Sequence, residues 1–119
     1  MRGDGPVVRD GTFLGCLFES LAVQTVRVLA TALHCGVFHF RLHGGDREVD
    51  IIVERPDHKV VAIEVKLSAQ VRPAHVRDLN WLAAFAPGQI IDKVVLTTGD
   101  RAYRRPDGVA VVPLALLGR

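Results

Sequence analysis

Three charged side chains stand on two short apolar runs that both predict β-strands. Asp50 lies in the run Glu48 to Glu54. Glu64 and Lys66 lie two residues apart in the run Val60 to Lys66. Both runs are rich in β-branched residues, which favour strands. Because unpaired charge is unfavourable inside a sheet, these groups must pair, bind a metal ion or lie at an open end of the sheet.

The two runs are expected to form a hairpin, because the stretch 55–59 between them carries turn residues. Successive side chains of a strand point to opposite faces, so Asp50 is expected on the face of Ile52, and Glu64 on that of Lys66. The opposite face is expected to hold Val49, Ile51, Val53, Val61, Ile63 and Val65. The alternative to a reactive site is an ion pair between Lys66 and Asp50 or Glu64 in a partly buried sheet.

A long helix is predicted before these strands, from a cap at Thr12 to about Cys35. Glu19 lies on this helix with small neighbours, which would let its face approach the sheet and bring the carboxylate towards Asp50. The alternative is a solvated surface glutamate. The buried stripe itself is predicted at the larger apolar residues that recur at helical spacing, namely Leu14, Leu17, Leu21, Val28 and Ala32.

The rest of the chain predicts four more elements. Strands are expected at Val37 to His43, at Ile90 to Thr98 and at Val109 to Leu117, and a second helix is expected to begin at Pro73. The order is helix, three strands, helix, two strands. This order predicts an α/β fold in which both helices flank a mixed sheet.

The turn between the last two strands carries three arginines and one tyrosine. Arginines beside an aromatic ring can bind the phosphates of a nucleic acid. A solvated loop is the alternative. The candidate nucleic-acid contacts are Arg101, Arg104 and Arg105 in this turn and Arg72 before the second helix.

Asp50 followed by Glu64-Val-Lys66 on the next strand resembles the PD-(D/E)XK nuclease superfamily. The closer similarity is to the nuclease-like domain, of unknown function, that follows the ATPase module in bacterial AAA-type ATPases. The similarity runs from Gly11 to about Leu117 and includes Glu19 on the first helix. One departure is that a valine, not a proline, precedes the aspartate.

The resemblance implies a restriction-endonuclease-like core, in the order αβββαββ, that hydrolyses DNA phosphodiesters. Asp50, Glu64 and the backbone carbonyl of Val65 would bind Mg²⁺ or Mn²⁺. Lys66 would orient the attacking water, and Glu19 would add a further carboxylate. The resemblance also implies an AAA-type ATPase as a partner.

Two other functions stay open beside the enzyme. The domain could be a catalytically inert module, a remnant or split part of such an ATPase, that docks onto a protein partner. It could also bind DNA without cleaving it. The sequence lacks the Gly-rich phosphate loop with Lys-Ser or Lys-Thr, so it cannot hydrolyse ATP by that route.

Length and composition agree with one small folded domain. The chain has 119 residues and a formal charge of +2, which permits nucleic-acid binding without demanding it. A lead-in at residues 1–10 and a single domain at residues 11–119 are expected. The start lacks the apolar core of a signal peptide, and no apolar run approaches the roughly 20 residues that span a bilayer. A cytoplasmic location without membrane contact is therefore predicted.

Overall fold

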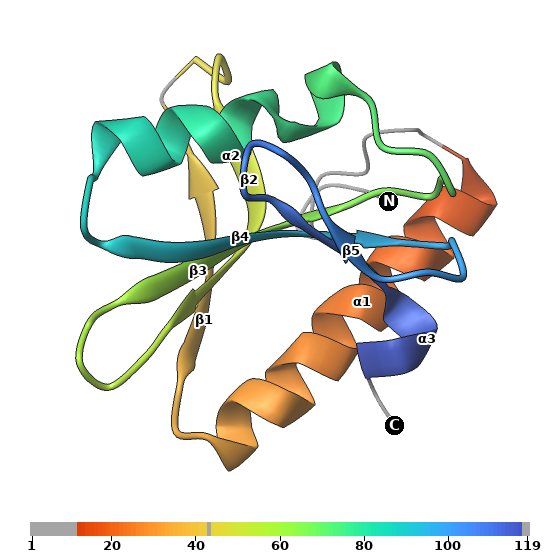
Figure 1. Ribbon diagram of the computed structural model, residues 1–119. Helices are drawn as coiled ribbons and strands as arrows, with labels where there is room; N and C mark the ends of the chain where they lie inside the picture. The colour runs from red at the N-terminus through yellow and green to blue at the C-terminus, as the bar shows by residue number, and fades with distance from the viewer. Residues whose placement is uncertain (1–11, 43, 118–119) are drawn as a thin grey trace.

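The computed structural model describes residues 12–42 and 44–117, which form a mixed sheet with helices on both faces. Figure 1 shows α1 and α3 below the sheet and α2 above it. The predicted α/β architecture and element order are confirmed, with one two-residue strand and one short helix in addition. The elements are α1 (Phe13–Ala32), β1 (Gly36–Arg41), β2 (Glu48–Glu54), β3 (Val60–Val65), α2 (Pro73–Phe85), β4 (Ile90–Thr97), β5 (Tyr103–Arg104), β6 (Ala110–Pro113) and α3 (Leu114–Leu117).

The six strands lie in the order β1-β2-β3-β4-β6-β5. β1, β2 and β3 form an antiparallel meander, and α2 then carries the chain across to β4, which runs parallel to β3. β6 is parallel to β4 and antiparallel to β5. The central position expected for the strand at 90–98 is confirmed, because β4 lies between β3 and β6.

The last predicted strand, 109–117, is wrong in its second half. β6 ends at Pro113, and Leu114–Leu117 forms the short helix α3. Proline has no N–H for the strand ladder, so it is a natural end for β6. α3 then places Leu114 in the same apolar cluster as Ala22 and Val26 of α1.

The face of α1 that packs on the sheet is not the one predicted from its leucines. The helix starts as expected, because Thr12 Oγ1 accepts the Gly15 N–H at 2.8 Å. The predicted stripe faces outward instead: Leu14, Leu17 and Leu21 are 65%, 50% and 58% exposed, and Val28 and Ala32 are also exposed. The buried stripe is made of smaller residues around one acid, namely Gly15, Glu19, Ala22, Val26 and Ala30.

Small side chains explain this choice of face. Glycine and alanine let the helix backbone approach the sheet more closely than leucine would, so the packed face is chosen by fit as well as by hydrophobicity. With these outward leucines, α1 is apolar enough, and long enough, to cross a membrane by length and composition alone. This differs from the expectation that no apolar run is long enough to span a bilayer. A core helix of a soluble domain and a signal sequence have the same property. Here α1 packs on the sheet through Ala22 and Val26.

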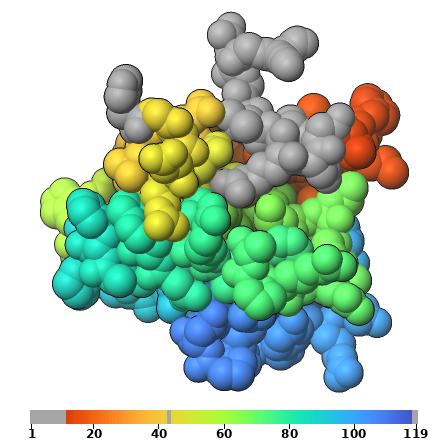
Figure 2. Space-filling model, turned by 90° about the horizontal axis from the view of Figure 1, so that it is seen from above, coloured from red at the N-terminus to blue at the C-terminus, as the bar shows by residue number. Residues whose placement is uncertain are grey.

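Two apolar clusters fill the two sides of the sheet. The cluster under α1 includes Ile51, Ile63 and Val65. The cluster under α2 includes Val49 and Ala62 of the sheet with the predicted helix stripe Val76, Leu79 and Leu82. Figure 2, seen from the α2 side, shows this helix and the loop before it as one continuous band across the molecule.

Candidate active site

The strand β2 carries a bulge at the predicted site. Phe38 pairs with Ile52 and Phe40 pairs with Val49, so Asp50 and Ile51 together face one residue of β1. Such an extra residue bends the strand and re-aims its side chains, and bulges are frequent beside active sites.

The bulge overturns the predicted alternation of faces along β2. Val49 packs under α2, whereas Ile51 and Val53 pack under α1, although simple alternation puts all three on one face. The common face predicted for Val49, Ile51 and Val53 is therefore wrong at Val49, because the prediction assumed a regular strand. On β3 the alternation holds, since Val61, Ile63 and Val65 all pack under α1.

Asp50 and Glu64 occupy the point where β2 and β3 stop pairing. The last regular pair at this end is Ile51 with Ile63. Beyond it, Asp50 Oδ2 accepts the Val65 N–H at 2.8 Å, and Glu64 Oε1 accepts the Asp50 N–H at 3.3 Å. Both side chains are buried, at 6% and 1% exposure. The two carboxylates thus continue the ladder in place of backbone carbonyls, and hydrogen bonds to a charged acceptor are stronger than neutral ones.

A cavity of about 270 Å³ lies at this end of the sheet. Its lining includes Glu19 of α1, Val65 and Lys66 at the end of β3, and Arg72 and His75 at the start of α2. Three residues predicted from the sequence as site residues, Glu19, Val65 and Lys66, thus share one hollow. Asp50 and Glu64 are not among the lining residues, but the hydrogen bond to Val65 joins Asp50 to the cavity wall.

Lys66 is held at the cavity by its backbone. Its N–H donates to the Leu96 carbonyl at 2.9 Å, which extends the pairing of β3 with β4. Within the described residues, the Lys66 ammonium takes part in none of the ion pairs, so the Lys66–Asp50 or Lys66–Glu64 pair considered as an alternative is not formed there.

Glu19 lies on the sheet-facing side of α1 and is only 7% exposed. The solvated surface glutamate considered as an alternative is therefore wrong. In the part of the chain that the structure describes, however, no three histidine, cysteine, aspartate or glutamate side chains are grouped to hold a metal ion. Glu19 thus shares the cavity with Lys66 but does not form such a group with Asp50 and Glu64.

The paired carboxylates of Asp50 and Glu64 still fit one kind of metal. Mg²⁺ is commonly held by one or two carboxylates, with water and substrate phosphates completing its shell. Asp50 and Glu64 offer two such carboxylates, and Asp50 is joined to the cavity by its hydrogen bond with the lining residue Val65. They do not match zinc in a structural site, which needs four protein ligands.

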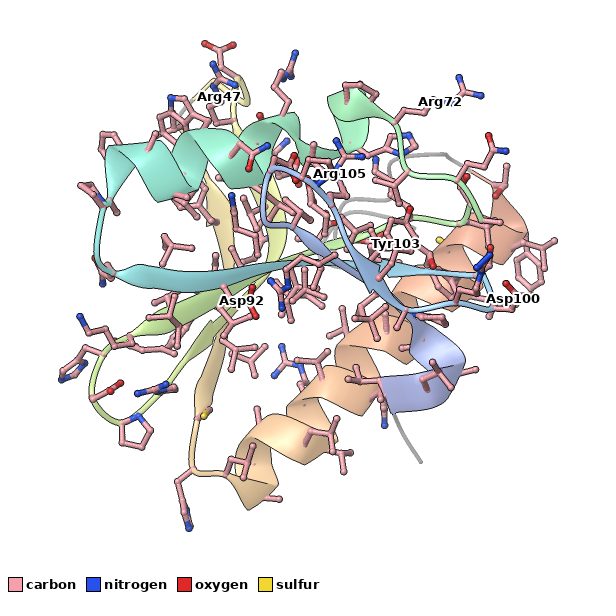
Figure 3. All side chains as sticks on the ribbon, viewed as in Figure 1. Arg47, Arg72, Asp92, Asp100, Tyr103 and Arg105 are labelled. Atoms are coloured by element: carbon pink, nitrogen blue, oxygen red, sulfur yellow. The ribbon has the colours of Figure 1, made fainter. Side chains whose placement is uncertain are left out.

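The arginines of the 99–108 turn are not brought together. Arg104 donates to Asp92 Oδ1 at 2.9 Å and to the Gly108 carbonyl at 2.8 Å. Arg105 pairs with Asp107 and also reaches the Val71 carbonyl at 3.4 Å. Figure 3 shows Asp92 below the sheet and Arg105 above it, at the corner where Arg72 projects.

The four arginines predicted to bind phosphate differ in whether they already bind another part of the protein. The carboxylate of Asp92 raises the pKa of Arg104, which keeps its charge but ties it to the fold. Arg101 is exposed and makes no ion pair with the described part of the chain. Arg72 is exposed at the rim of the cavity.

Two histidines near the site were not among the site residues predicted from the sequence. His39 lies opposite the bulge, and its Nδ1 donates to the Asp50 carbonyl at 3.2 Å. His75 stands at the third position of α2, where its Nδ1 accepts the Arg72 N–H at 3.1 Å. The signal for His75 was present in the sequence: a proline opening a helix marks its first turn, where a third-position side chain reaches back to the cap.

The chain matches the model of a family described as a domain of unknown function, DUF4143, over residues 14–117. The chain belongs to this family. The match covers α1 to α3 and so includes the strands and the cavity described above. Comparisons of this DUF4143 domain with curated proteins and with solved structures give no match.

Proposed function

We propose that this DUF4143 domain is a PD-(D/E)XK-type nuclease that hydrolyses phosphodiester bonds of DNA with Mg²⁺ or Mn²⁺. The observation that carries the proposal is the shared cavity. Glu19 from α1 and Lys66 from β3 are far apart in the sequence, yet both line it. Val65, between Glu64 and Lys66, also connects Asp50 to the cavity, because the Val65 N–H donates to the Asp50 carboxylate.

Each residue has a role that its position supports. Asp50, Glu64 and the Val65 carbonyl would hold the cation, and Glu19 would bind it directly or through water. The cation, when bound, neutralises phosphate charge and makes a water nucleophilic. Lys66 would orient the attacking water and stabilise the negative charge that develops on the phosphate.

A second candidate is a catalytically inert module that binds DNA or docks onto an AAA-type ATPase. One observation favours it. Asp50 and Glu64 each accept a backbone N–H where β2 and β3 separate, which is a structural role that needs no metal. In either case we propose that the domain is cytoplasmic, with α1 packed on the sheet as part of the fold.

Cleavage with a lysine variant tests the enzyme. The wild-type protein should nick plasmid or branched DNA when Mn²⁺ or Mg²⁺ is added, and Lys66→Ala should not. Lys59→Ala is the matched control, because Lys59 precedes the other end of β3 and contacts the Gly88 carbonyl. If neither wild type nor control cleaves any DNA, the nuclease proposal fails and the inert module replaces it.

A further inference from the structure

The cavity at the end of β3 has more positive than negative charge in its lining. Lys66 and Arg72 are cationic, and Glu19 is the only carboxylate among the described lining residues. Ser68 also lines the cavity, but its hydroxyl donates to the Gln70 carbonyl at 2.9 Å and so is already engaged. The remaining polar side chain is His75.

The hydrogen bond that His75 makes fixes the position of its proton. The Arg72 N–H is a donor, so His75 Nδ1 must accept and carries no proton. Burial, followed by the positive charges of Lys66 and Arg72, lowers the pKa of the His75 imidazole. A neutral ring with an unprotonated Nδ1 carries its proton on Nε2. His75 is therefore a neutral hydrogen-bond donor in the cavity lining.

We propose that this cavity is a binding site for a phosphate group, in which His75 donates its Nε2–H to a phosphate oxygen while Lys66 and Arg72 supply positive charge. The choice of a nucleic-acid phosphate as the natural ligand rests on the proposed nuclease function. The binding itself does not, because it requires neither a metal ion nor cleavage.

The chemistry of the lining selects an oxyanion over other ligands. Two cations and a neutral donor, against one carboxylate, attract an oxyanion, and an apolar ligand would leave these donors without acceptors. Arg72 and His75 belong to the N-terminal turn of α2, where the positive end of the helix dipole lies. The cavity of about 270 Å³ holds a phosphate with part of its ester rather than a duplex.

The competing explanation is that His75 is only a helix cap, and two variants separate the roles. Glutamate and glutamine both accept the cap N–H from the third helix position. His75→Gln keeps an N–H donor for the ligand. His75→Glu keeps the cap and suits the helix dipole, but puts a negative charge into the cavity. Both variants should therefore stay folded, which thermal unfolding checks.

The experiment follows the imidazole signals by ¹H–¹⁵N NMR in EDTA, with His75→Gln used to assign His75. The probes are inorganic phosphate and a dinucleotide with or without a 5′-phosphate. Phosphate and the phosphorylated dinucleotide should shift the His75 Nε2 signal and raise the pKa of its ring. The unphosphorylated dinucleotide should bind more weakly if an end phosphate is recognised, and equally well if an internal phosphodiester suffices.

The variants give the affinities that decide the proposal. His75→Glu should weaken phosphate binding about tenfold or more, because a hydrogen bond to a charged group is lost and repulsion is added. The phosphate affinity of His75→Gln should stay within about threefold of wild type, a smaller change than the loss of one such hydrogen bond would cause. Arg72→Gln should weaken binding, and Lys59→Gln, which removes a positive charge at the other end of β3, should not. A His75 signal unmoved by phosphate, or equal affinity in wild type and His75→Glu, overturns the proposal. Phosphate binding without DNA cleavage would leave it standing and remove only the nuclease function.

Discussion

The backbone N–H of Val65 donates a 2.8 Å hydrogen bond to Oδ2 of Asp50, although fifteen residues separate them. The bond joins the strand that carries the Glu-x-Lys motif to the strand that carries the aspartate, at the point where their regular pairing ends. The same carboxylate is thus a structural acceptor and the main candidate metal ligand. Substitutions at Asp50 must distinguish these two roles.

Asp50→Ala should destabilise the fold by about 1–3 kcal/mol, because it leaves the buried Val65 N–H without its acceptor. Asp50→Asn should cost less, since its amide oxygen can still accept that hydrogen bond. Urea unfolding of the two variants measures the difference. Asp46→Ala, on the exposed turn before β2, is the control and should change little. Equal loss in both Asp50 variants would show that the carboxylate charge, not the hydrogen bond, matters to the fold.

The outward leucines of α1 give a second test. Leu21→Ala should change stability by no more than about 0.5 kcal/mol, because Leu21 is 58% exposed. Ala22→Leu, one position on, should destabilise by about 1–3 kcal/mol, because Ala22 is fully buried against the sheet and a larger side chain forces the helix away. Thermal unfolding of both variants decides which face is packed. A large loss in Leu21→Ala with none in Ala22→Leu would restore the stripe predicted from the sequence.

Most of the fold was predictable from the sequence because the longer strands are marked by their own residues. The β-branched runs of β2, β3 and β4 and the turn residues between them are enough for a meander and a crossover helix. The packed face of α1 was not predictable in the same way. Periodicity finds large apolar residues, whereas Gly15, Ala22 and Ala30 are buried for their small size. Only the shape of the facing sheet selects between the two stripes.

The sequence predicted which residues form the site better than it predicted how they are arranged. Glu19, Val65 and Lys66 do meet in one cavity. The position of Asp50 depends on a bulge that adds one residue opposite β1, and no residue type in β2 signals it. The prediction for the arginines was wrong for a different reason. Their shared turn suggested that they bind one phosphate together, but Arg104 pairs with Asp92 and Arg105 pairs with Asp107.

These partners predict which arginines affect DNA binding. Arg72→Ala and Arg101→Ala should weaken binding and each reduce the slope of affinity against salt by about one. Arg104→Ala should leave affinity unchanged, because its guanidinium is already held by Asp92. Arg105→Ala should instead destabilise the fold by about 1 kcal/mol through the lost contact to Val71. Fluorescence anisotropy with a labelled oligonucleotide at several salt concentrations measures these effects, and an equal loss in all four would indicate a general charge effect.

The lowered pKa of His75 predicts how stability depends on pH. The imidazole has a pKa of about 6.5 in an unfolded chain. Because its pKa is lower in the folded state, the unfolded chain binds more protons as the pH falls, and protonation favours unfolding. The contribution of His75 is therefore complete above about pH 6.5 and is lost as the pH falls through the folded-state value.

Removing the imidazole should flatten this dependence. His75→Gln should lose less stability than wild type between pH 7.5 and pH 5.5, measured by urea unfolding. His34→Asn is the control, since His34 is exposed and asparagine accepts its positive φ of 61°. The same slope in wild type and His75→Gln would mean that the His75 ring does not titrate differently in the folded state.

Metal addition separates the enzyme from the inert module. Asp50 and Glu64 are both buried where β2 and β3 separate, and a cation bound by their oxygens would offset their negative charge. A ligand that binds only the folded state raises its melting temperature. Millimolar Mn²⁺ or Mg²⁺ should therefore stabilise the wild-type protein. The gain should be modest without DNA, because the described residues supply fewer than three grouped ligands.

Variants make this last prediction specific. Asp50→Asn should abolish the metal-induced gain, because it removes one of the two carboxylates that would hold the cation. Lys66→Ala should keep the gain, because Lys66 acts on the water and phosphate rather than on the cation. Adding DNA together with Mn²⁺ should raise the melting temperature more than either alone, since a phosphate would complete the shell of the ion. A wild-type protein that gains no stability from metal, with or without DNA, would leave Asp50 and Glu64 with only the backbone role seen at the separation of β2 and β3.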